Sequence, residues 1–345
     1  MRKVLVIDNN EIRKKKETIK MAKVKNFKTI FPAVSVPLND DYSINESEFR
    51  AYLRWIKTFY GKGMDGLVCN GHTGEITGLT RAERKRVVEI CAEECGDVMT
   101  IISGVNCENT AESIEMAKEA KEAGADGILL MPPHMWLRFG MNPDAPFEYV
   151  KDVAEGADID IIIHLYPATS KAFYPVETLI KMCKEIDHVK CIKMGTRVTS
   201  IYEHDVRLLR QECPDISLIT CHDETLCVSW FPGMDGALIG FAGCVPEIIC
   251  PAREVFANPD KHTLKEAQDW SDRIYHISQA IYGGGQPSGE AHARLKEALK
   301  QRGIFSSALM RKPVLPLNQE EKDWVALGLE RSQLPEVDMA QFEDK

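Results

Sequence analysis

From Thr29 onward, the chain alternates short apolar segments with longer amphipathic ones. The apolar segments are rich in β-branched residues and too short for buried helices, which is typical of strands covered on both faces. We therefore predict eight strands, at Ile30–Val36, Gly66–Asn70, Met99–Gly104, Gly127–Met131, Ile159–Tyr166, Val189–Lys193, Ile216–Cys221 and Gly236–Ile239.

The segments between these strands repeat apolar residues with the period of a helix. Helices are expected there at Glu46–Tyr60, Arg81–Cys95, Thr110–Ala123, Pro175–Glu185 and His204–Glu212, among others. Strands that alternate with helices form βαβ units, and eight consecutive units can close on themselves. The pattern thus predicts an α/β fold, a (β/α)8 TIM barrel.

After Pro246 the pattern is purely helical, and we predict a C-terminal helical appendage on the barrel. Helices are expected at Glu247–Phe256, which still belongs to the barrel, at Lys265–Ile281 and Gly289–Gln301 in the appendage and, as a short element of the tail, at Glu320–Leu329. The predicted organisation is an N-terminal extension over 1–26, the barrel over 27–258, a C-terminal helical region over 259–318 and a tail over 319–345.

Three of the predicted strands are preceded by the same short sequence. A Gly-x-Asp-Gly pattern occurs at Gly63–Gly66, Gly124–Gly127 and Gly233–Gly236. Glycine is favoured just beyond the end of a helix, and aspartate is common in turns. We therefore expect each pattern to end one helix and to lead into the next strand.

The composition is that of an ordinary globular protein. The chain has 345 residues, 44% hydrophobic and 28% charged, with a formal net charge of −9, which disfavours nucleic acid and membrane surfaces as partners. No apolar run approaches the roughly 18 residues of a membrane-spanning helix. The 11 cysteines are scattered and include no Cys-x-x-Cys pair, so we expect reduced thiols and a cytoplasmic protein.

One stretch, Val189–Thr196, combines a strand pattern with a lysine near the end of the strand. With a period of two, Val189, Cys191 and Lys193 share one face, so we expect Lys193 to be buried. Burial lowers the pKa of a lysine and leaves a neutral amine, which can attack a ketone and form a Schiff base. A strand-end lysine that reaches solvent is the alternative interpretation of this stretch alone.

Other candidate side chains also follow predicted strands, at the end of a barrel where active sites lie. The loop Gly71-His72-Thr73-Gly74-Glu75 comes after the second strand, and backbone N–H groups between its glycines can turn toward an anion. Tyr166 ends the fifth strand, two residues after His164 and on the same face. A tyrosine beside a neutral lysine can move protons during catalysis.

In their order and spacing, these motifs resemble those of the dihydrodipicolinate synthase and N-acetylneuraminate lyase superfamily of Schiff-base aldolases. The resemblance rests on the Gly-x-Thr-Gly-Glu loop, Tyr166, Lys193 and the glycine-rich eighth strand, Gly236–Gly240. Arg311–Leu317 is similar to the closing Leu-Pro-x-x-Pro-Leu segment of the family. The similar part of the chain covers roughly residues 27–318.

The resemblance implies that Lys193 forms a Schiff base with a 2-oxo acid, usually pyruvate, and that no metal or organic cofactor takes part. It implies that Tyr166 relays protons and that Thr73 and Gly74 hold the keto-acid carboxylate. The reaction would be reversible aldol-type C–C bond formation or cleavage with an aldehyde. Further substrate contacts are expected from His72, His134, Trp136, Lys171 and Ile239.

Three departures argue against aspartate semialdehyde, the aldehyde of the lysine-pathway synthases, as the second substrate. Those synthases have a threonine at the position of His72 and a Pro-Tyr-Tyr motif where Pro132–Trp136 stand. The arginine that binds the carboxylate of their aldehyde aligns only with Lys171. An ammonium is a poor replacement for a bidentate guanidinium.

A hydratase-aldolase that acts on an aromatic 2-oxo acid is one alternative. Pro133–Trp136 resembles the Pro-Met-Trp segment of the hydratase-aldolases that cleave benzylidenepyruvates. Those enzymes, however, have Asp-Asn after the strand-five tyrosine, where this chain has Pro167-Ala168.

Two further alternatives belong to other functional classes. A metal-dependent barrel lyase or hydrolase could use the histidines near predicted strand ends, but no His-x-His or His-Glu-x-x-His spacing supports a ligand set. These residues are His72, His134, His164 and His222, with Glu75, Cys221 and Asp223 nearby. A non-enzymatic keto-acid-binding protein would be expected to lack Lys193 or Tyr166, and both are present.

The family resemblance also implies a homodimer or homotetramer, because barrels of this family pair near their active sites.

Overall fold

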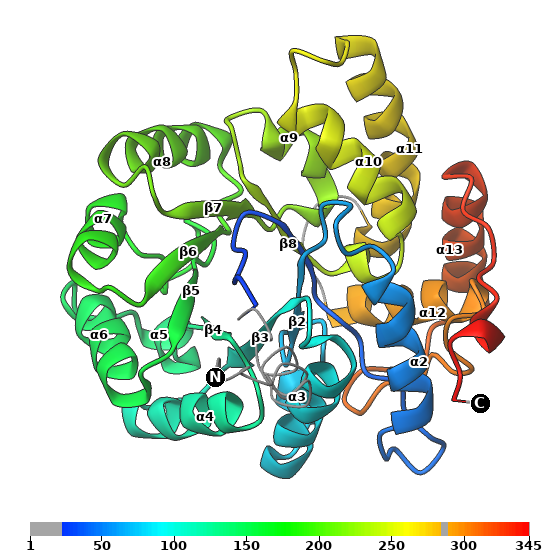
Figure 1. The fold of residues 1–345 in the computed structure, drawn as a ribbon, viewed down its shortest axis with the longest axis horizontal. Helices are drawn as coiled ribbons and strands as arrows, with labels where there is room; N and C mark the ends of the chain where they lie inside the picture. The colour runs from blue at the N-terminus through cyan, green and yellow to red at the C-terminus, as the bar shows by residue number, and fades with distance from the viewer. Residues whose placement is uncertain (1–22, 284–288, 345) are drawn as a thin grey trace, which may run out of the picture.

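A computed structural model describes residues 23–283 and 289–344, and an eight-stranded parallel barrel forms its centre (Figure 1). The strands are β1 (Ile30–Pro32), β2 (Gly66–Cys69), β3 (Thr100–Val105), β4 (Gly127–Leu130), β5 (Asp160–His164), β6 (Val189–Met194), β7 (Ser217–Thr220) and β8 (Gly236–Ile239). They pair in the order β1-β8-β7-β6-β5-β4-β3-β2, and a bridge between Ala33 and Val68 joins the two ends. The predicted (β/α)8 barrel is confirmed.

Helices surround the barrel, as Figure 1 shows. They are α2 (Glu46–Lys57), α3 (Arg81–Cys95), α4 (Thr110–Glu122), α5 (His134–Phe139), α6 (Ala145–Ala157), α7 (Val176–Glu185), α8 (Thr199–Glu212), α9 (Leu226–Trp230) and α10 (Pro246–Ala257). The larger hydrophobic cluster lies between strands and helices, and a smaller one, which includes Phe31, Ile102 and Cys191, fills the barrel. This layering explains why the strands are apolar on both faces.

The predicted helical appendage follows the barrel on one side of the molecule (Figure 1). It consists of α11 (Leu264–Tyr282), α12 (Gly289–Gln301) and α13 (Gln319–Arg331). Capping boxes at Thr263 and Asn318 begin α11 and α13, because each cap side chain accepts a backbone N–H of the first turn. The division at residues 258 and 318 stays a prediction, and residues 1–22 of the predicted extension lie outside the described part.

Several strands end earlier than the apolar pattern predicts. β1 ends at Pro32 rather than Val36, because the backbone leaves β8 there and Val34 donates its N–H to Val68, at 2.9 Å. β5 ends at His164, so Tyr166 lies in the loop beyond the strand rather than at its end. The apolar pattern of these strands therefore extends past the end of the strand into the loops at the barrel mouth.

One prediction about β6 is wrong. Cys191 belongs to the cluster inside the barrel, but Val189 belongs to the outer cluster and does not share its face. The register between β5 and β6 shifts between Ile161 and Ile162, and this irregularity turns Val189 outward. Lys193, two residues after Cys191 in the regular part of the strand, keeps the inward direction.

The Gly-x-Asp-Gly turns lead from a helix into β2, β4 and β8. Their first glycines have φ angles that favour glycine: 96° at Gly63, 104° at Gly124 and 93° at Gly233. The Asp126 carboxylate accepts the Ile101 N–H at 2.7 Å, and the Asp235 carboxylate accepts the Leu218 N–H at 2.9 Å. At Asp126 and Asp235 the turn therefore fixes where a strand starts against the one before it, whereas the Asp65 carboxylate accepts the Gly61 N–H at 2.9 Å.

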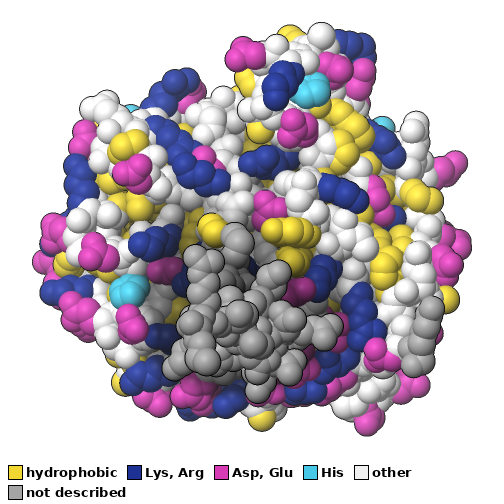
Figure 2. All heavy atoms as spheres, viewed as in Figure 1, with side chains coloured by type: hydrophobic (Ala, Val, Ile, Leu, Met, Phe, Trp, Pro, Cys, Tyr) yellow, Lys and Arg dark blue, Asp and Glu magenta, His cyan; other side chains and the backbone are white. Residues whose placement is uncertain are grey.

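Other expectations from composition can be compared with the described residues. No described helix has both the length and the apolar character needed to cross a membrane. All 11 cysteines are free thiols, and all except Cys183 are buried. Figure 2 shows acidic and basic side chains interspersed over the described part of one face of the molecule.

Candidate active site

The predicted reactive residues meet at one end of the barrel. In a parallel barrel the C-terminal ends of all strands open at the same mouth. Lys193 comes from the end of β6 and His164 from the end of β5, while Tyr166 and His72 come from the loops after β5 and β2. Residues far apart in sequence are thereby brought around one lysine.

Lys193 lies inside the barrel mouth. It pairs with His164 in the β5–β6 register, and it follows the inward-facing Cys191 by two residues. Within the described part of the chain, its ammonium takes part in no hydrogen bond or ion pair. Burial lowers the pKa of Lys193, whereas the Cys221 and Asp223 side chains oppose this shift. A larger fraction of this amine is therefore neutral than of an exposed lysine.

Tyr166 is in contact with two imidazole rings. Its hydroxyl lies 3.3 Å from the Nε2 atom of His72, within hydrogen-bond distance. The ring of His164 meets the ring of Tyr166 edge-on, with 4.9 Å between centroids, and lies 5.6 Å from the ring of His72. Burial raises the pKa of Tyr166, so the phenol stays protonated at neutral pH.

Both histidines are held in the neutral form. Burial lowers the pKa of His72 to about 3, with smaller contributions from the positive charges of Lys193, His292 and His134. Burial also lowers the pKa of His164 well below its ordinary value, and Lys193 adds to this shift. The Nδ1 atom of His164 is buried without a hydrogen-bond partner among the described residues. The lysine is therefore flanked by two neutral imidazoles, and no carboxylate among the described residues forms an ion pair with it.

The loop after β2 forms a tight turn beside β8. The Glu75 N–H donates to the His72 carbonyl at 2.9 Å, whereas no described acceptor binds the N–H groups of Thr73 and Gly74. A Cβ atom at Gly240 would lie 3.0 Å from the Thr73 hydroxyl oxygen, so the glycine lets the loop and the end of β8 approach closely. The hydroxyl and two N–H groups form a small set of donors that can bind a carboxylate.

A buried ion pair anchors this loop to the helical appendage. Glu75 has a left-handed backbone, with a φ of 56°, and its carboxylate pairs with Lys296 of α12. The side chains of Lys296 and Glu75 are only 1% and 9% exposed, and Lys296 also donates to the Leu309 carbonyl at 2.9 Å. Burial lowers the pKa of Lys296, and the Glu75 carboxylate opposes this shift.

Asp223 provides a buried carboxyl group after β7. It accepts the N–H groups of Gly240 at 2.7 Å and Phe241 at 3.3 Å, and it lies beside the Tyr282 hydroxyl. Burial raises the pKa of Asp223 to about 6, against the opposing effect of these hydrogen bonds and of Lys193. Its carboxylate is thus directed at the backbone after β8.

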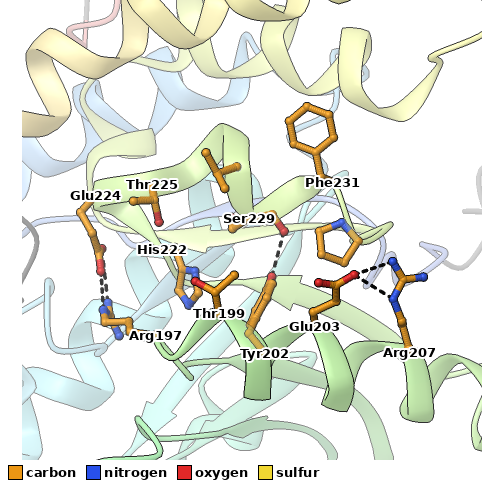
Figure 3. A pocket seen from close by; sticks show the side chains of 12 residues that line it. Arg197, Thr199, Tyr202, Glu203, Arg207, His222, Glu224, Thr225, Ser229 and Phe231 are labelled. Carbon is orange, nitrogen blue, oxygen red and sulfur yellow. Dashed lines mark hydrogen bonds and ion pairs between the residues drawn. The ribbon is translucent and has the colours of Figure 1, made fainter.

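A side pocket of about 420 Å³ lies between α8 and α9 (Figure 3). Arg197 forms an ion pair with Glu224 at its edge and donates to the Gly195 carbonyl at 3.1 Å. The ring of His222 lies tilted against that of Tyr202, with 4.7 Å between ring centroids, and burial lowers the pKa of His222 to about 4. Because Arg197 also affects the pKa of Lys193, this polar pocket adjoins the barrel mouth.

The remaining predicted site residues occupy other positions. His134 begins α5, where its Nε2 atom lies 3.2 Å from the Asn106 amide nitrogen and its Nδ1 atom 3.5 Å from Glu108. Ile239 is the buried last residue of β8. Lys171 is exposed and donates to the Arg138 carbonyl at 3.1 Å. The structure does not bring Lys171 together with Lys193.

Trp136 is the buried residue of α5 and packs in the large hydrophobic cluster. Its ring meets those of Tyr149 and Tyr174, at centroid distances of 5.6 and 6.2 Å. Its side chain is buried, in the same large cluster as Tyr166.

The histidines considered as metal ligands are divided among three places. His72 and His164 are neighbours, whereas His222 faces the side pocket and His134 lies beside Glu108. Across residues 23–283 and 289–344, no group of three or more His, Cys, Asp or Glu side chains is arranged to hold a metal ion.

Sequence reasoning missed the contribution of α12, because the apolar pattern assigned this helix only to the appendage. His292 lies close enough to Lys193 and His72 for their charges to affect one another. His292 and Lys296 are four residues apart on α12 and so lie on one helical face. The signal in the sequence was this pair of titratable residues among the apolar positions Ala291, Leu295 and Leu299.

The chain was compared with protein families and with curated proteins. The model of a family described as the dihydrodipicolinate synthetase family matches residues 26–331. A 4-hydroxy-tetrahydrodipicolinate synthase of Bartonella bacilliformis is 26% identical over 304 residues, which cover 88% of this chain and 97% of the relative. An uncharacterized DapA-like lyase of Thermofilum pendens is 25% identical over 292 residues, which cover 84% and 92%.

Solved structures have the same fold. Dihydrodipicolinate synthase from Aquifex aeolicus superposes with a TM-score of 0.79 at 19% identity, and the match covers 90% of this chain and 100% of that one. YagE, a prophage protein from Escherichia coli K12 solved in complex with pyruvate, superposes with a TM-score of 0.79 at 20% identity, covering 89% and 99%.

Proposed function

The chain belongs to the dihydrodipicolinate synthetase family of lyases, and we propose that it forms a Schiff base between Lys193 and pyruvate or a related 2-oxo acid. The covalent intermediate would serve aldol-type bond formation or cleavage with an aldehyde. The observation that carries this proposal is the state of Lys193 inside the barrel mouth. Burial lowers its pKa, and no described carboxylate forms an ion pair with it. A neutral amine is the form that attacks a ketone.

The donors after β2 suit the carboxylate of the 2-oxo acid. The Thr73 hydroxyl and the N–H groups of Thr73 and Gly74 have no partner among the described residues. Binding the carboxylate there would hold the neighbouring keto carbon in place for attack, which lowers the entropic part of the barrier. The Glu75–Lys296 ion pair supports this role, because it fixes the end of the same loop.

In the proposed reaction, the Lys193 amine attacks the keto carbon to give a carbinolamine, which loses water to form an iminium. The iminium withdraws electrons from the adjacent carbon, so a C–H or C–C bond there can break. Tyr166 would move protons to and from the carbinolamine, because its phenol lies at the same mouth and stays protonated at neutral pH.

The second substrate would be an aldehyde other than aspartate semialdehyde. Lys171, which aligns with the carboxylate-binding arginine of the lysine-pathway synthases, is exposed and bonded to the Arg138 carbonyl. The polar pocket beside Arg197 and Glu224 adjoins the mouth and offers room for such a partner. An aromatic 2-oxo acid, as in hydratase-aldolases, has weaker support because Trp136 packs against Tyr149 and Tyr174.

We also propose that the protein is a homodimer or homotetramer. Helix α5, which begins at His134 beside the mouth, exposes Met135, Leu137 and Phe139, an apolar surface that a second copy could cover. One solved structural neighbour is described as the first monomeric dihydrodipicolinate synthase variant. Size-exclusion chromatography with light scattering tests the proposal, and a species of 38.8 kDa alone would contradict it.

Borohydride reduction of the purified protein with pyruvate, followed by peptide mass spectrometry, tests the proposed function. We expect a reduced pyruvate adduct on Lys193. The proposal would be contradicted by an adduct on another lysine, or if no 2-oxo acid of a panel gave an adduct. The metal content of the same sample separates the remaining alternatives, since stoichiometric metal without an adduct would favour a metal-dependent lyase or hydrolase. Binding of the 2-oxo acid without turnover would favour a sensor.

A further inference from the structure

We propose that Cys183 and Cys213 form a disulfide when the protein is exposed to a hydroperoxide. Cys183 lies in the last turn of α7, and Cys213 is the residue that ends α8. The segment between them contains β6 and so carries Lys193. The modification is independent of the proposed Schiff base, because it needs none of the side chains at the barrel mouth.

Contacts on either side of the two cysteines bring them together. The Sγ atom of Cys213 lies 3.9 Å from the carbonyl oxygen of Ile180, which is one helical turn before Cys183. Next to the cysteines, the Nζ atom of Lys184 lies 2.7 Å from the Oε2 atom of Glu212. The two thiols are themselves hydrogen-bonded to each other. Because α7 and α8 pack side by side, the sulfurs can meet without a movement of whole helices (Figure 1).

Bond formation requires only a local change. An S–S bond is about 2.05 Å long, so the two sulfurs must approach more closely than in a hydrogen bond. Both cysteines lie in the final turn of a helix or directly after it, where the backbone yields more easily than in the middle of a helix. Rotation of the side chains and a small shift of the two helix ends can therefore supply the approach.

Cys183 differs from the other cysteines in its exposure. All 11 cysteines lie in the described part of the chain, and Cys183 alone is not buried. A second thiol pair, Cys69 of β2 and Cys91 of α3, is also hydrogen-bonded, but both residues are 0% exposed. An oxidant in solvent therefore reaches Cys183, whereas the core screens the second pair, which provides an internal control.

The groups around the pair favour Cys213 as the attacking thiolate. Burial raises the pKa of Cys213, and Glu212 adds to this shift, whereas Lys184 and the hydrogen bond with Cys183 oppose it. Burial also raises the pKa of Cys183, and Cys213 adds to that shift. The thiolate is the nucleophilic form of a cysteine. We therefore expect slow oxidation of Cys183, followed by attack of Cys213.

The bond changes balance with the hydroperoxide as oxidant. The Cys183 sulfur attacks the outer peroxide oxygen, the S–O bond forms, the O–O bond breaks, and an alcohol or water leaves with the thiol proton. The Cys213 sulfur then attacks the sulfur of this sulfenic acid, the S–S bond forms, the S–O bond breaks, and the hydroxyl leaves as water with the Cys213 proton. The two thiols lose one electron pair, and the peroxide gains it.

Treatment of the full-length protein with hydrogen peroxide tests the proposal. The remaining thiols are then alkylated in denaturant, and the peptides are analysed by mass spectrometry without reduction. We expect a cross-linked peptide pair that joins Cys183 to Cys213, is lighter than the two reduced peptides by two hydrogen atoms and disappears after treatment with dithiothreitol. Cys69 and Cys91 should be fully alkylated in the same sample.

Cys183→Ser and Cys213→Ser should each abolish the cross-link while circular dichroism shows an unchanged fold. Oxidised wild type should melt about 4 °C higher than reduced wild type, because the disulfide constrains the unfolded chain, and neither variant should show this shift. The proposal is overturned if both cysteines remain alkylated, if Cys183 carries only sulfinic or sulfonic acid, or if it bonds to a second copy of the chain. A disulfide between Cys69 and Cys91 alone would also overturn it, because exposure would then not select the pair.

Discussion

Two lysines lie near the mouth of this barrel, Lys296 buried and Lys193 partly buried, and their surroundings differ. Lys296 of α12 is paired with the Glu75 carboxylate and donates to a backbone carbonyl. Lys193 of β6 has no such partner in the described chain and lies among the neutral rings of His72, His164 and Tyr166. Burial lowers the pKa of both lysines, so burial alone does not identify a nucleophile. What distinguishes the expected nucleophile is that no carboxylate forms an ion pair with it.

The difference has an energetic basis. A buried ion pair holds its proton on the lysine, because the neutral amine would leave an uncompensated carboxylate in a low-dielectric environment. Lys193 has no paired carboxylate and loses its proton more easily, because desolvation is the largest effect on its pKa and the side chains of Cys221 and Asp223 oppose it only in part. The two lysines nevertheless serve one site, because Glu75 belongs to the loop that carries Thr73.

The sharpest test of this comparison removes the unpaired lysine and leaves the paired one. Lys193→Ala should abolish the borohydride-trapped adduct with pyruvate, because Lys193 is the amine inside the mouth that no described carboxylate or carbonyl binds. Circular dichroism should show an unchanged fold. An adduct that persists on Lys296 in this variant would show that the ion pair does not distinguish the two residues.

A large effect on stability is expected at the other lysine. Lys296→Met removes the only charged partner that the described residues give the Glu75 carboxylate, and it should lower the free energy of unfolding by about 3–5 kcal/mol. Urea denaturation measures the change. Glu75→Gln added to Lys296→Met should recover part of it, because the isolated charge is then removed. The adduct should still form on Lys193 in both variants, provided that they are folded.

The neutral histidines around Lys193 predict a loss of stability in acid. A histidine with a lowered pKa contributes stability that is fully present above its ordinary pKa of 6.5 and is lost as the pH falls toward its folded value. For His72, whose folded pKa is about 3, the loss between pH 7 and pH 5 is at most about 2 kcal/mol. We therefore expect a weaker dependence of the unfolding free energy on pH in His72→Gln over this range. If His72→Gln does not reduce the dependence of the unfolding free energy on pH between pH 7 and pH 5, the fold does not hold His72 in the neutral form.

The smallest expected effect concerns the carboxylate near Lys193. Asp223 raises the pKa of Lys193 through its charge, but its hydrogen bonds go to Gly240 and Phe241. Asp223→Asn keeps an oxygen for these N–H groups and removes the charge. The Lys193 pKa should fall, so the acid limb of the adduct-formation rate should move to lower pH by less than about one unit. A shift to higher pH would contradict this account.

Much of the barrel could be predicted from the sequence, because local patterns encode it. Arg81–Cys95, Gly289–Gln301 and Gly236–Ile239 have the predicted bounds, since periodicity and turn residues act over a few positions. The outward turn of Val189 could not be predicted, because it comes from a register irregularity against β5. The placement of Lys171 at the surface likewise depends on its contact with Arg138, 33 residues away in the chain.

The sequence by itself determined the alternation of strands and helices, the lysine at the C-terminal end of the sixth strand and the polar loop after the second. These features are local, and each can be derived from neighbouring residues. Only the tertiary structure decided that Glu75 pairs with Lys296, that His72 lies against the Tyr166 hydroxyl, and that α12 brings His292 near them. Their protonation depends on burial and on charges from distant segments, and the barrel closure that brings these segments together sets both.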